Sequence, residues 1–306
     1  MKMLSKEELA TIERQIYNKA RDLDVALYNA LFDDMGKEFV LDSLMLYVNR
    51  DGGFGSALDI DNYNPNSSVY QTYEALRILD AYGFDKNCTD DLYVQMMNKI
   101  GNYLFNRSPL IDGLWNPLVK TNDDFAHSEE YNYMENPFSI WGVHPTAAIL
   151  GYMLTSFPEN KAYYKKALKQ LNFVFAYLDA KKSFSTYDFI SFNQLLGSLK
   201  KLEILKEEQD KIEERLIEEA MLHLEDQAFP FAAYLSNVSL PDTLKACVDA
   251  NLDIILSSRA SHGLWEHKKG WGSTRYPEAD SAALKWIGAE SVWNLFLLKQ
   301  YGRIEQ

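Results

Sequence analysis

The sequence predicts an all-α fold in which about 10–12 helices form a double ring, with mostly apolar helices inside and amphipathic helices outside. Two observations carry this prediction. Apolar residues recur at helical spacing along most of the 306 residues, and loops that join a small residue to an aromatic one recur between the helices. These loops contain Gly53-Phe54, Gly113-Leu114-Trp115 and Gly263-Leu264-Trp265. Each is followed, after a polar stretch, by an apolar helix, so the chain reads as a repeat.

The first loop and its helix give the clearest pattern. Glycines in 51–55 suit a turn that needs positive φ or a close backbone approach, and Phe54 can fill the gap between two helices. Ser68 offers an N-cap oxygen, and Ser68 with Gln71 has the spacing of a capping box. Gly83 lies where a left-handed residue ends a helix. We therefore predict a helix over 68–82.

Similar reasoning predicts the remaining elements. Apolar helices are expected over 145–157 and 289–301, and a helix with a polar face over 161–178. Glutamates between 207 and 219 indicate a solvated outer helix. The loops 52–66 and 109–143 are too long for simple connections, so we expect them to cover one mouth of the ring. No change in composition marks a boundary, which predicts one domain over 1–306.

The Gly-Gly-Phe loop and the helix with Thr72 and Ala75 resemble the repeat of the α/α-toroid superfamily. That superfamily includes terpenoid cyclases such as squalene-hopene cyclase and the β subunits of protein prenyltransferases. The stretch DGGFGSALDIDNYNPNSS is similar to a bacterial group with this fold. The resemblance implies a single α/α toroid and is strong over one repeat.

The loop Asp59-Ile60-Asp61-Asn62 resembles the Asp-x-Asp-Asp motif of class II terpenoid cyclases, whose central carboxylic acid protonates an alkene or epoxide. The resemblance implies that Asp61 is the acid and that Asp59 tunes it. The sequence departs from the motif because Asn62 replaces its last aspartate and residues 64–70 separate it from the helix. From the residues alone, an acidic turn that accepts backbone N–H groups is the alternative.

Further substrate-binding side chains are expected in the long loops and in the last helix. Glu290 and Asn294 are four residues apart on an apolar helix, so they share a face, which suits either a buried pocket or support of neighbouring backbone groups. The other candidates are Trp115, Tyr131, Trp141, His144, Trp265, Arg275 and Tyr276.

Composition excludes several classes of partner. A net charge of −13 disfavours nucleic acids and anionic membrane surfaces, since both need a basic face. No apolar run is long enough to span a bilayer, so no transmembrane segment is expected. Only two cysteines, Cys88 and Cys247, are present, which suits a cytoplasmic location.

We predict no metal site and no cofactor. Neither cysteine follows an aspartate by two residues, as the zinc site of protein prenyltransferases would require. His127, Glu129 and His144 have no compact metal-ligand spacing, although a divalent metal stays open as an alternative.

Three functions remain open at this stage. The first is acid-initiated chemistry on an isoprenoid or another small apolar ligand, which requires an apolar cavity with one carboxyl pair. The second is a non-catalytic ring that binds a ligand or a protein, which a filled centre would favour. The third is a carbohydrate-active hydrolase or lyase, which requires an open cleft with aromatic platforms and two carboxylates.

Overall fold

The computed structural model describes residues 1–33, 36–266, 270–271 and 276–305. Over these ranges it contains thirteen α-helices and a single pair of two-residue strands, which confirms the predicted all-α class. The helices are α1 (Lys6–Lys19), α2 (Asp22–Phe32), α3 (Lys37–Leu44), α4 (Val69–Ala81), α5 (Asp91–Asn106), α6 (Phe138–Trp141), α7 (Thr146–Ser156), α8 (Ala162–Ala180), α9 (Thr186–Leu202), α10 (Lys206–Met221), α11 (Phe231–Tyr234), α12 (Asp242–Ser257) and α13 (Glu278–Gln300). The strands are β1 (Leu110–Ile111) and β2 (Leu114–Trp115), and short 3-10 helices cover Lys120–Asp124 and Glu129–Tyr131.

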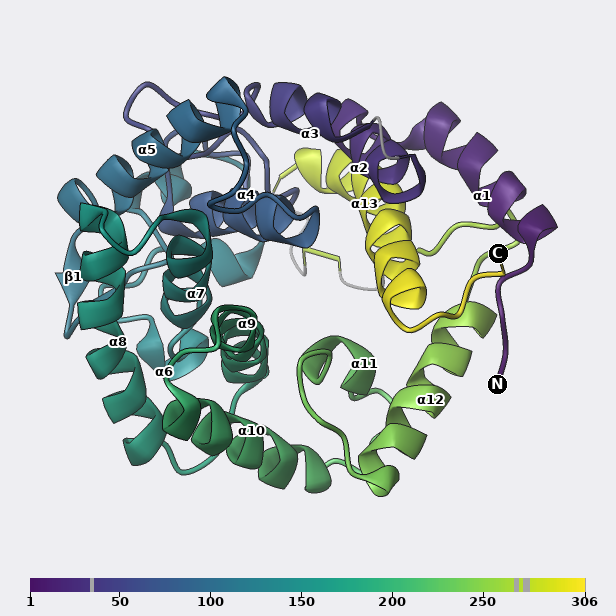
Figure 1. Cartoon of the computed structure of the whole chain (residues 1–306). Coiled ribbons are helices and arrows are strands. Elements are labelled where there is room, and N and C mark those ends of the chain that lie inside the picture. The colour runs from purple at the N-terminus through teal and green to yellow at the C-terminus, as the bar shows by residue number, and fades with distance from the viewer. Residues whose placement is uncertain (34–35, 267–269, 272–275, 306) are drawn as a thin grey trace.

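The helices are arranged around a centre. Figure 1 shows α1, α5, α8, α10 and α12 along the outside and α4, α7, α9, α11 and α13 nearer the middle. Helix α7 packs against α4, α8 and α9, and α13 packs against α1 and α2. Every residue of α7 except Ser156 is buried, whereas α10 exposes three of its six glutamates and buries only Glu219. Helix α7 is therefore apolar all round, and α10 is amphipathic.

Helix α4 begins as predicted but uses its cap residues differently. The Ser68 hydroxyl accepts a hydrogen bond from the Gln71 amide at 3.1 Å, and Gly83 ends the segment with a φ of +76°. The Gln71 side chain does not return to Ser68. Its Oε1 accepts from the Leu58 amide at 3.0 Å and its Nε2 donates to the Asn64 carbonyl at 3.3 Å. Gln71 thus holds the preceding loop against the helix that follows it.

The loops that carry an aromatic residue share one backbone contact. In each, the amide of the aromatic residue donates to a hydroxyl on the next inner helix, which attaches the loop to that helix. The pairs are Phe54 with Thr72 at 3.1 Å, Trp115 with Thr146 at 2.9 Å and Trp265 with Ser291 at 3.1 Å.

Both tryptophans also bind the preceding outer helix. The Trp115 indole donates to the Leu104 carbonyl at 3.0 Å, near the end of α5, and the Trp265 indole donates to the Ile255 carbonyl at 2.7 Å, near the end of α12. Carbonyls in the last turn of a helix lack intrahelical partners, so these indoles satisfy them. Each tryptophan consequently joins an outer helix to an inner one.

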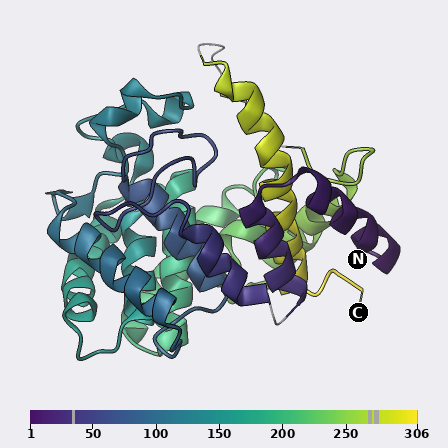
Figure 2. The same ribbon diagram turned by 90° about the horizontal axis from the view of Figure 1, so that it is seen from above.

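The two long loops are bonded to each other. The Asn122 side chain accepts from the Asn62 and Asn64 side-chain amides at 3.2 and 2.9 Å, and the Ser128 amide donates to the Asp61 carbonyl at 2.9 Å. Figure 2 shows these loops on the same side of the ring as the beginning of α13. Segments far apart in the sequence are therefore joined on this side of the molecule.

The ends of the chain meet. Leu4 pairs with Ile304 in a parallel bridge, in which the Leu4 amide donates to the Arg303 carbonyl at 2.8 Å and the Glu305 amide donates to the Leu4 carbonyl at 3.0 Å. The Arg303 side chain is fully buried and binds Asp249 at 2.8 Å and Asp253 at 2.7 Å on α12. These contacts close the ring between its first and last segments (Figure 1).

Candidate functional site

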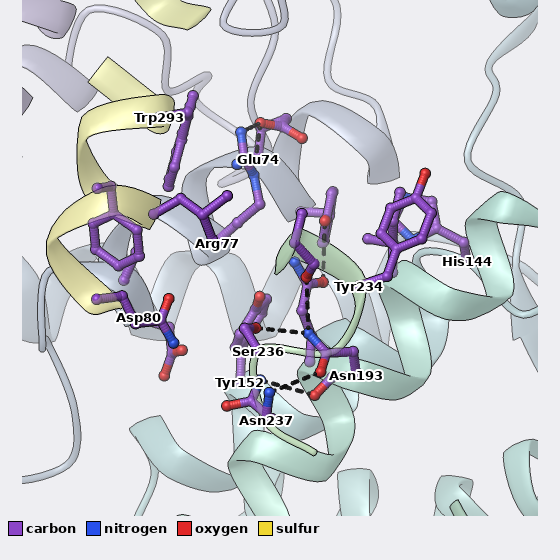
Figure 3. Close-up of a pocket in the computed structure, with 18 of the residues that line it drawn as sticks. Glu74, Arg77, Asp80, His144, Tyr152, Asn193, Tyr234, Ser236, Asn237 and Trp293 are labelled. Atoms are coloured by element: carbon purple, nitrogen blue, oxygen red, sulfur yellow. Dashed lines mark hydrogen bonds and ion pairs between the residues drawn. The ribbon is translucent and has the colours of Figure 1, made fainter. Parts of the chain in front are cut away.

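A cavity of about 590 Å³ lies among α4, α7, α9, α11 and α13. Part of its lining is aromatic and part is charged or amide-bearing (Figure 3). The aromatic residues are Tyr70, Tyr73, Tyr152, Tyr234, Trp286, Trp293 and Phe296. The charged and amide-bearing residues are Asp59, Glu74, Arg77, Asp80, Asn193, Gln194, Asn237, Glu290, Asn294 and Gln300. A pocket of this size and lining suits a small-molecule ligand.

Asp59 is the aspartate of the predicted pair that lines the cavity. Its side chain is 7% exposed, and its Oδ1 accepts a hydrogen bond from the Asp61 amide at 2.8 Å. Burial raises the pKa of Asp59 well above its ordinary value, and the negative charges of Glu74 and Asp61 raise it further. Asp59 is thus a carboxyl group that retains its proton more readily than an ordinary aspartate.

Asp61 is not among the residues that line the cavity. Its Oδ1 accepts from two indoles, Trp271 Nε1 at 2.6 Å and Trp286 Nε1 at 2.7 Å. Hydrogen bonds of this kind favour the charged form of a carboxylate. Of the two aspartates, Asp59 therefore faces the cavity, whereas two indoles hold Asp61 outside its lining.

Glu74 and Arg77 form an ion pair on the wall of the cavity. The Arg77 Nη2 lies 2.5 Å from Glu74 Oε2, and its Nε donates to the same oxygen at 3.1 Å. The guanidinium lies 3.8 Å from the ring centre of Trp293 on α13, where a cation and an indole face attract each other. Figure 3 shows this stack at one end of the pocket. Because both partners occupy fixed positions, Glu74 is a positioned second carboxylate near Asp59.

The opposite wall is held by amides. The Asn193 side chain donates to the Ser236 hydroxyl at 2.9 Å, and its Oδ1 accepts from the Asn237 amide at 3.0 Å. Figure 3 shows this network between α9 and the segment around α11. It fixes the separation of the two elements, and it places neutral hydrogen-bonding groups beside the cavity.

Of the other predicted residues, His144, Glu290 and Asn294 line the cavity. The Asn294 amide lies 3.4 Å from Glu290 Oε1, which confirms that the two side chains share a face of α13. Trp286 and Trp293 come from the same helix and complete that wall. The polar residues of the last helix therefore face the centre of the ring.

The remaining candidates lie elsewhere. Trp115 and Trp265 are buried in the core with their indoles on outer-helix carbonyls, and they do not line the cavity. Tyr131 and Trp141 pack behind Tyr70, with ring centres 5.5 and 5.1 Å from it, and do not line the cavity. They support its wall from outside.

Two candidates come from the segment before α13. Tyr276 packs against His127 at 5.5 Å and Trp271 at 6.3 Å between ring centres, in the small apolar cluster beside Asp61, and is not a lining residue. Arg275 lies outside the described residues.

Sequence reasoning missed Glu74 and Arg77. A signal was present, because they are two charged residues three apart on a helix that was predicted to be an inner one. Like Glu290 and Asn294, they share one face of their helix and could have been predicted to point inward. Asn193 and Asn237 had no comparable signal, since their pairing depends on contacts between separate elements.

Among the described residues, no three histidine, cysteine, aspartate or glutamate side chains converge closely enough to hold a metal ion. In the same part of the chain, none of the helices has the length and apolar character needed to cross a membrane.

A scan against protein-family models finds no match, and a search of curated proteins finds none either.

Proposed function

We propose that this protein is an enzyme that uses Asp59 as a general acid on a neutral, hydroxylated substrate such as an oligosaccharide. The single observation that carries the proposal is the placement of Asp59, a buried carboxyl with a raised pKa, on the wall of a cavity lined by aromatic rings. A general acid needs a proton at working pH and contact with the substrate, and these features supply both.

The mixed lining favours a sugar over an isoprenoid. Glu74, Arg77, Glu290 and the amides on α9 and α13 face the cavity, and a hydrocarbon chain would remove water from them without replacing its hydrogen bonds. Sugar hydroxyls can donate to carboxylates and accept from amides, while the apolar faces of a sugar ring pack on Tyr and Trp. For this reason the carbohydrate-active function, which came last of the three expected from sequence, is placed first.

In the proposed reaction, Asp59 donates its proton to the glycosidic oxygen as the bond from that oxygen to the sugar carbon breaks. Glu74, held by Arg77, faces the positive charge that develops at the carbon. A water then adds its hydroxyl group to the carbon and returns its proton to Asp59. Charge and atoms balance without a further reactant.

Acid-initiated isoprenoid chemistry is the second candidate, and two features favour it. The residues Asp59 to Asn62 resemble the cyclase motif, and tyrosine and tryptophan rings could stabilise a carbocation. The second proposal also includes the proposal that the protein is a member of the α/α-toroid superfamily. A non-catalytic ring is the third possibility, for which Asp59 would be dispensable.

The test is a substrate screen with the wild type, Asp59→Asn and Asp124→Asn as a matched control, since Asp124 is an exposed aspartate at the end of a 3-10 helix. The panel contains neutral oligosaccharides, 4-nitrophenyl glycosides, squalene and geranylgeraniol. We expect turnover of a glycoside that falls by about 10²- to 10⁴-fold in Asp59→Asn and is unchanged in the control. Turnover of an isoprenoid alone would favour the second candidate, and activity that survives in Asp59→Asn would remove Asp59 from the mechanism.

A further inference from the structure

His144 is held rigidly on the wall of the cavity. The residue is 1% exposed, lines the cavity and precedes α7. Its ring is nearly parallel to those of Trp141 and Tyr187, with interplanar angles of 7° and 20°, and lies edge-on to Tyr73 with ring centres 4.7 Å apart. Rings on several sides prevent the imidazole from turning, so each of its nitrogens has a fixed direction.

One nitrogen is occupied and the other is available. Nδ1 lies 2.8 Å from the Ser191 hydroxyl on α9, and Nε2 has no hydrogen-bond partner among the described residues. The cavity supplies the space beside this ring, so a bound ligand is the partner that Nε2 can acquire. A ligand that offers an oxygen at this position gains a hydrogen bond that the protein itself leaves open.

The Ser191 contact selects the tautomer. Ser191 is fully buried, and within the described residues its hydroxyl bonds only to His144. If Nδ1 carried the proton, the hydroxyl hydrogen would have no acceptor there. If Nδ1 is unprotonated, it accepts that hydrogen and both groups are satisfied. The ring proton then belongs on Nε2, which makes Nε2–H a donor.

The ring is also neutral. Burial lowers the pKa of His144 to about 3, and the positive charge of Arg77 lowers it further. Asp59 and Glu74 line the same cavity, but Glu74 is paired with Arg77 and Asp59 holds its own proton more tightly than usual. Burial and the charge of Arg77 outweigh these two carboxyl groups, so the imidazole stays neutral.

We infer that His144 presents a neutral Nε2–H donor to the cavity and binds an uncharged acceptor oxygen of the substrate, a hydroxyl or a carbonyl. This inference rests on the proposed function, because it names how the substrate of the same site is recognised. An ammonium group opposite Nε2–H would place two donors together, so the part of the substrate that meets His144 carries no amine. His144 also takes no part in proton transfer, which stays with Asp59.

The first test measures the tautomer directly. Long-range ¹H–¹⁵N spectra of the whole protein separate its five histidines, and the signal absent from His144→Gln assigns this one. We expect an unprotonated Nδ1 and a protonated Nε2 that do not change between about pH 5 and about pH 8, a range that brackets ordinary imidazole titration. A His144 signal that titrates near 6.5, or a proton on Nδ1, would overturn the inference. In Ser191→Ala, which lacks the donor to Nδ1, the preference for Nε2–H should weaken.

The second test uses the neutral oligosaccharide with the highest kcat/KM in the screen. His144→Phe keeps a flat ring without a donor, and His144→Gln keeps a neutral N–H donor. We expect KM to rise up to about tenfold in the Phe variant, the value of one hydrogen bond, and less in the Gln variant, with kcat changed less than KM. His262→Gln, which does not line the cavity, should leave both unchanged. An unchanged KM in His144→Phe would overturn the inference, whereas a screen without turnover would reject the proposed function and leave the spectra to decide the tautomer.

Discussion

At the scale of single residues, Asp59 links function to stability. Its pKa is raised in the folded state, so the folded protein binds a proton more tightly than the unfolded chain does. The resulting stability is complete below the unfolded value of 3.8 and is lost as pH rises toward the folded pKa. We expect Asp59→Asn to remove this loss, so that the variant is more stable than the wild type at neutral pH. Denaturation in urea at several pH values measures the free energy of unfolding of both proteins. An equal decline of that free energy with rising pH in both would contradict the assignment.

The charge of Asp61 is expected to set the pH dependence of activity. Its negative charge helps to raise the pKa of Asp59, and its Oδ1 receives two indoles. Asn at this position keeps a carbonyl oxygen for the indoles and removes the charge. We therefore expect Asp61→Asn to keep activity, with the loss of kcat/KM at high pH shifted to lower pH. A pH profile identical to that of the wild type would show that the charge has no such role.

Sequence could predict that this loop is chemically important, but not which carboxylate faces the ligand. That choice depends on Trp271 and Trp286, which lie more than 200 positions along the chain from Asp61. The predicted polar face of Glu290 and Asn294 needed only helical spacing, so it could be read locally. Contacts between separate elements, such as that of Asn193 with Asn237, leave no periodic pattern in the sequence.

At the scale of elements, the two loop tryptophans are expected to stabilise the fold without binding substrate. Trp115→Phe keeps an aromatic ring but removes the hydrogen bond to the Leu104 carbonyl at the end of α5. We expect a loss of about 1–3 kcal/mol in the free energy of unfolding, because a buried acceptor is left unpaired. KM for the best substrate should not change. A changed KM with unchanged stability would return Trp115 to the site.

The glycine loops should tolerate no side chain. A Cβ on Gly53 would lie 2.6 Å from the Ser67 Cβ and 2.8 Å from the Tyr103 ring, and Gly113 has a φ of +82° with the Phe173 ring against it. We expect Gly53→Val to cost about 1–3 kcal/mol in thermal denaturation. Gly270→Ala is the matched control, since nothing lies within 4 Å of the added atom. An unchanged midpoint for Gly53→Val would argue against close packing in this loop.

Element boundaries could be predicted where a cap or a glycine marks them. Ser68 and Gly83 placed α4 to within a residue, whereas α13 begins at Glu278 and not near 289. The first part of α13 packs through Ala282 and Trp286 on the cluster beside Asp61, outside the repeated pattern of loop and inner helix. The repeated pattern gives no signal for the first part of α13, because that part lies outside the repeat.

At the scale of the whole molecule, Arg303 is expected to be important for stability. Its buried guanidinium binds two aspartates of α12 and the Lys2 carbonyl at 2.8 Å, so it joins both ends of the chain to an outer helix. Arg303→Met keeps much of the side-chain volume and loses these bonds. We expect about 2–4 kcal/mol of destabilisation by urea unfolding, compared with little change in Arg14→Met on the exposed side of α1. Equal midpoints for the two variants would show that the bonds of Arg303 contribute nothing to stability.

The pairing of Leu4 with Ile304 protects the two ends of the chain from local opening. Terminal residues usually fray, and open stacks of helices lose structure from their outermost units first. Here each end is the neighbour of the other, so neither can detach without breaking the bonds of both. The Leu4 and Glu305 amides should therefore exchange with deuterium about as slowly as amides in α7, and only when the molecule opens as a whole. Because the two ends pair with each other, neither end is a preferred place for unfolding to begin.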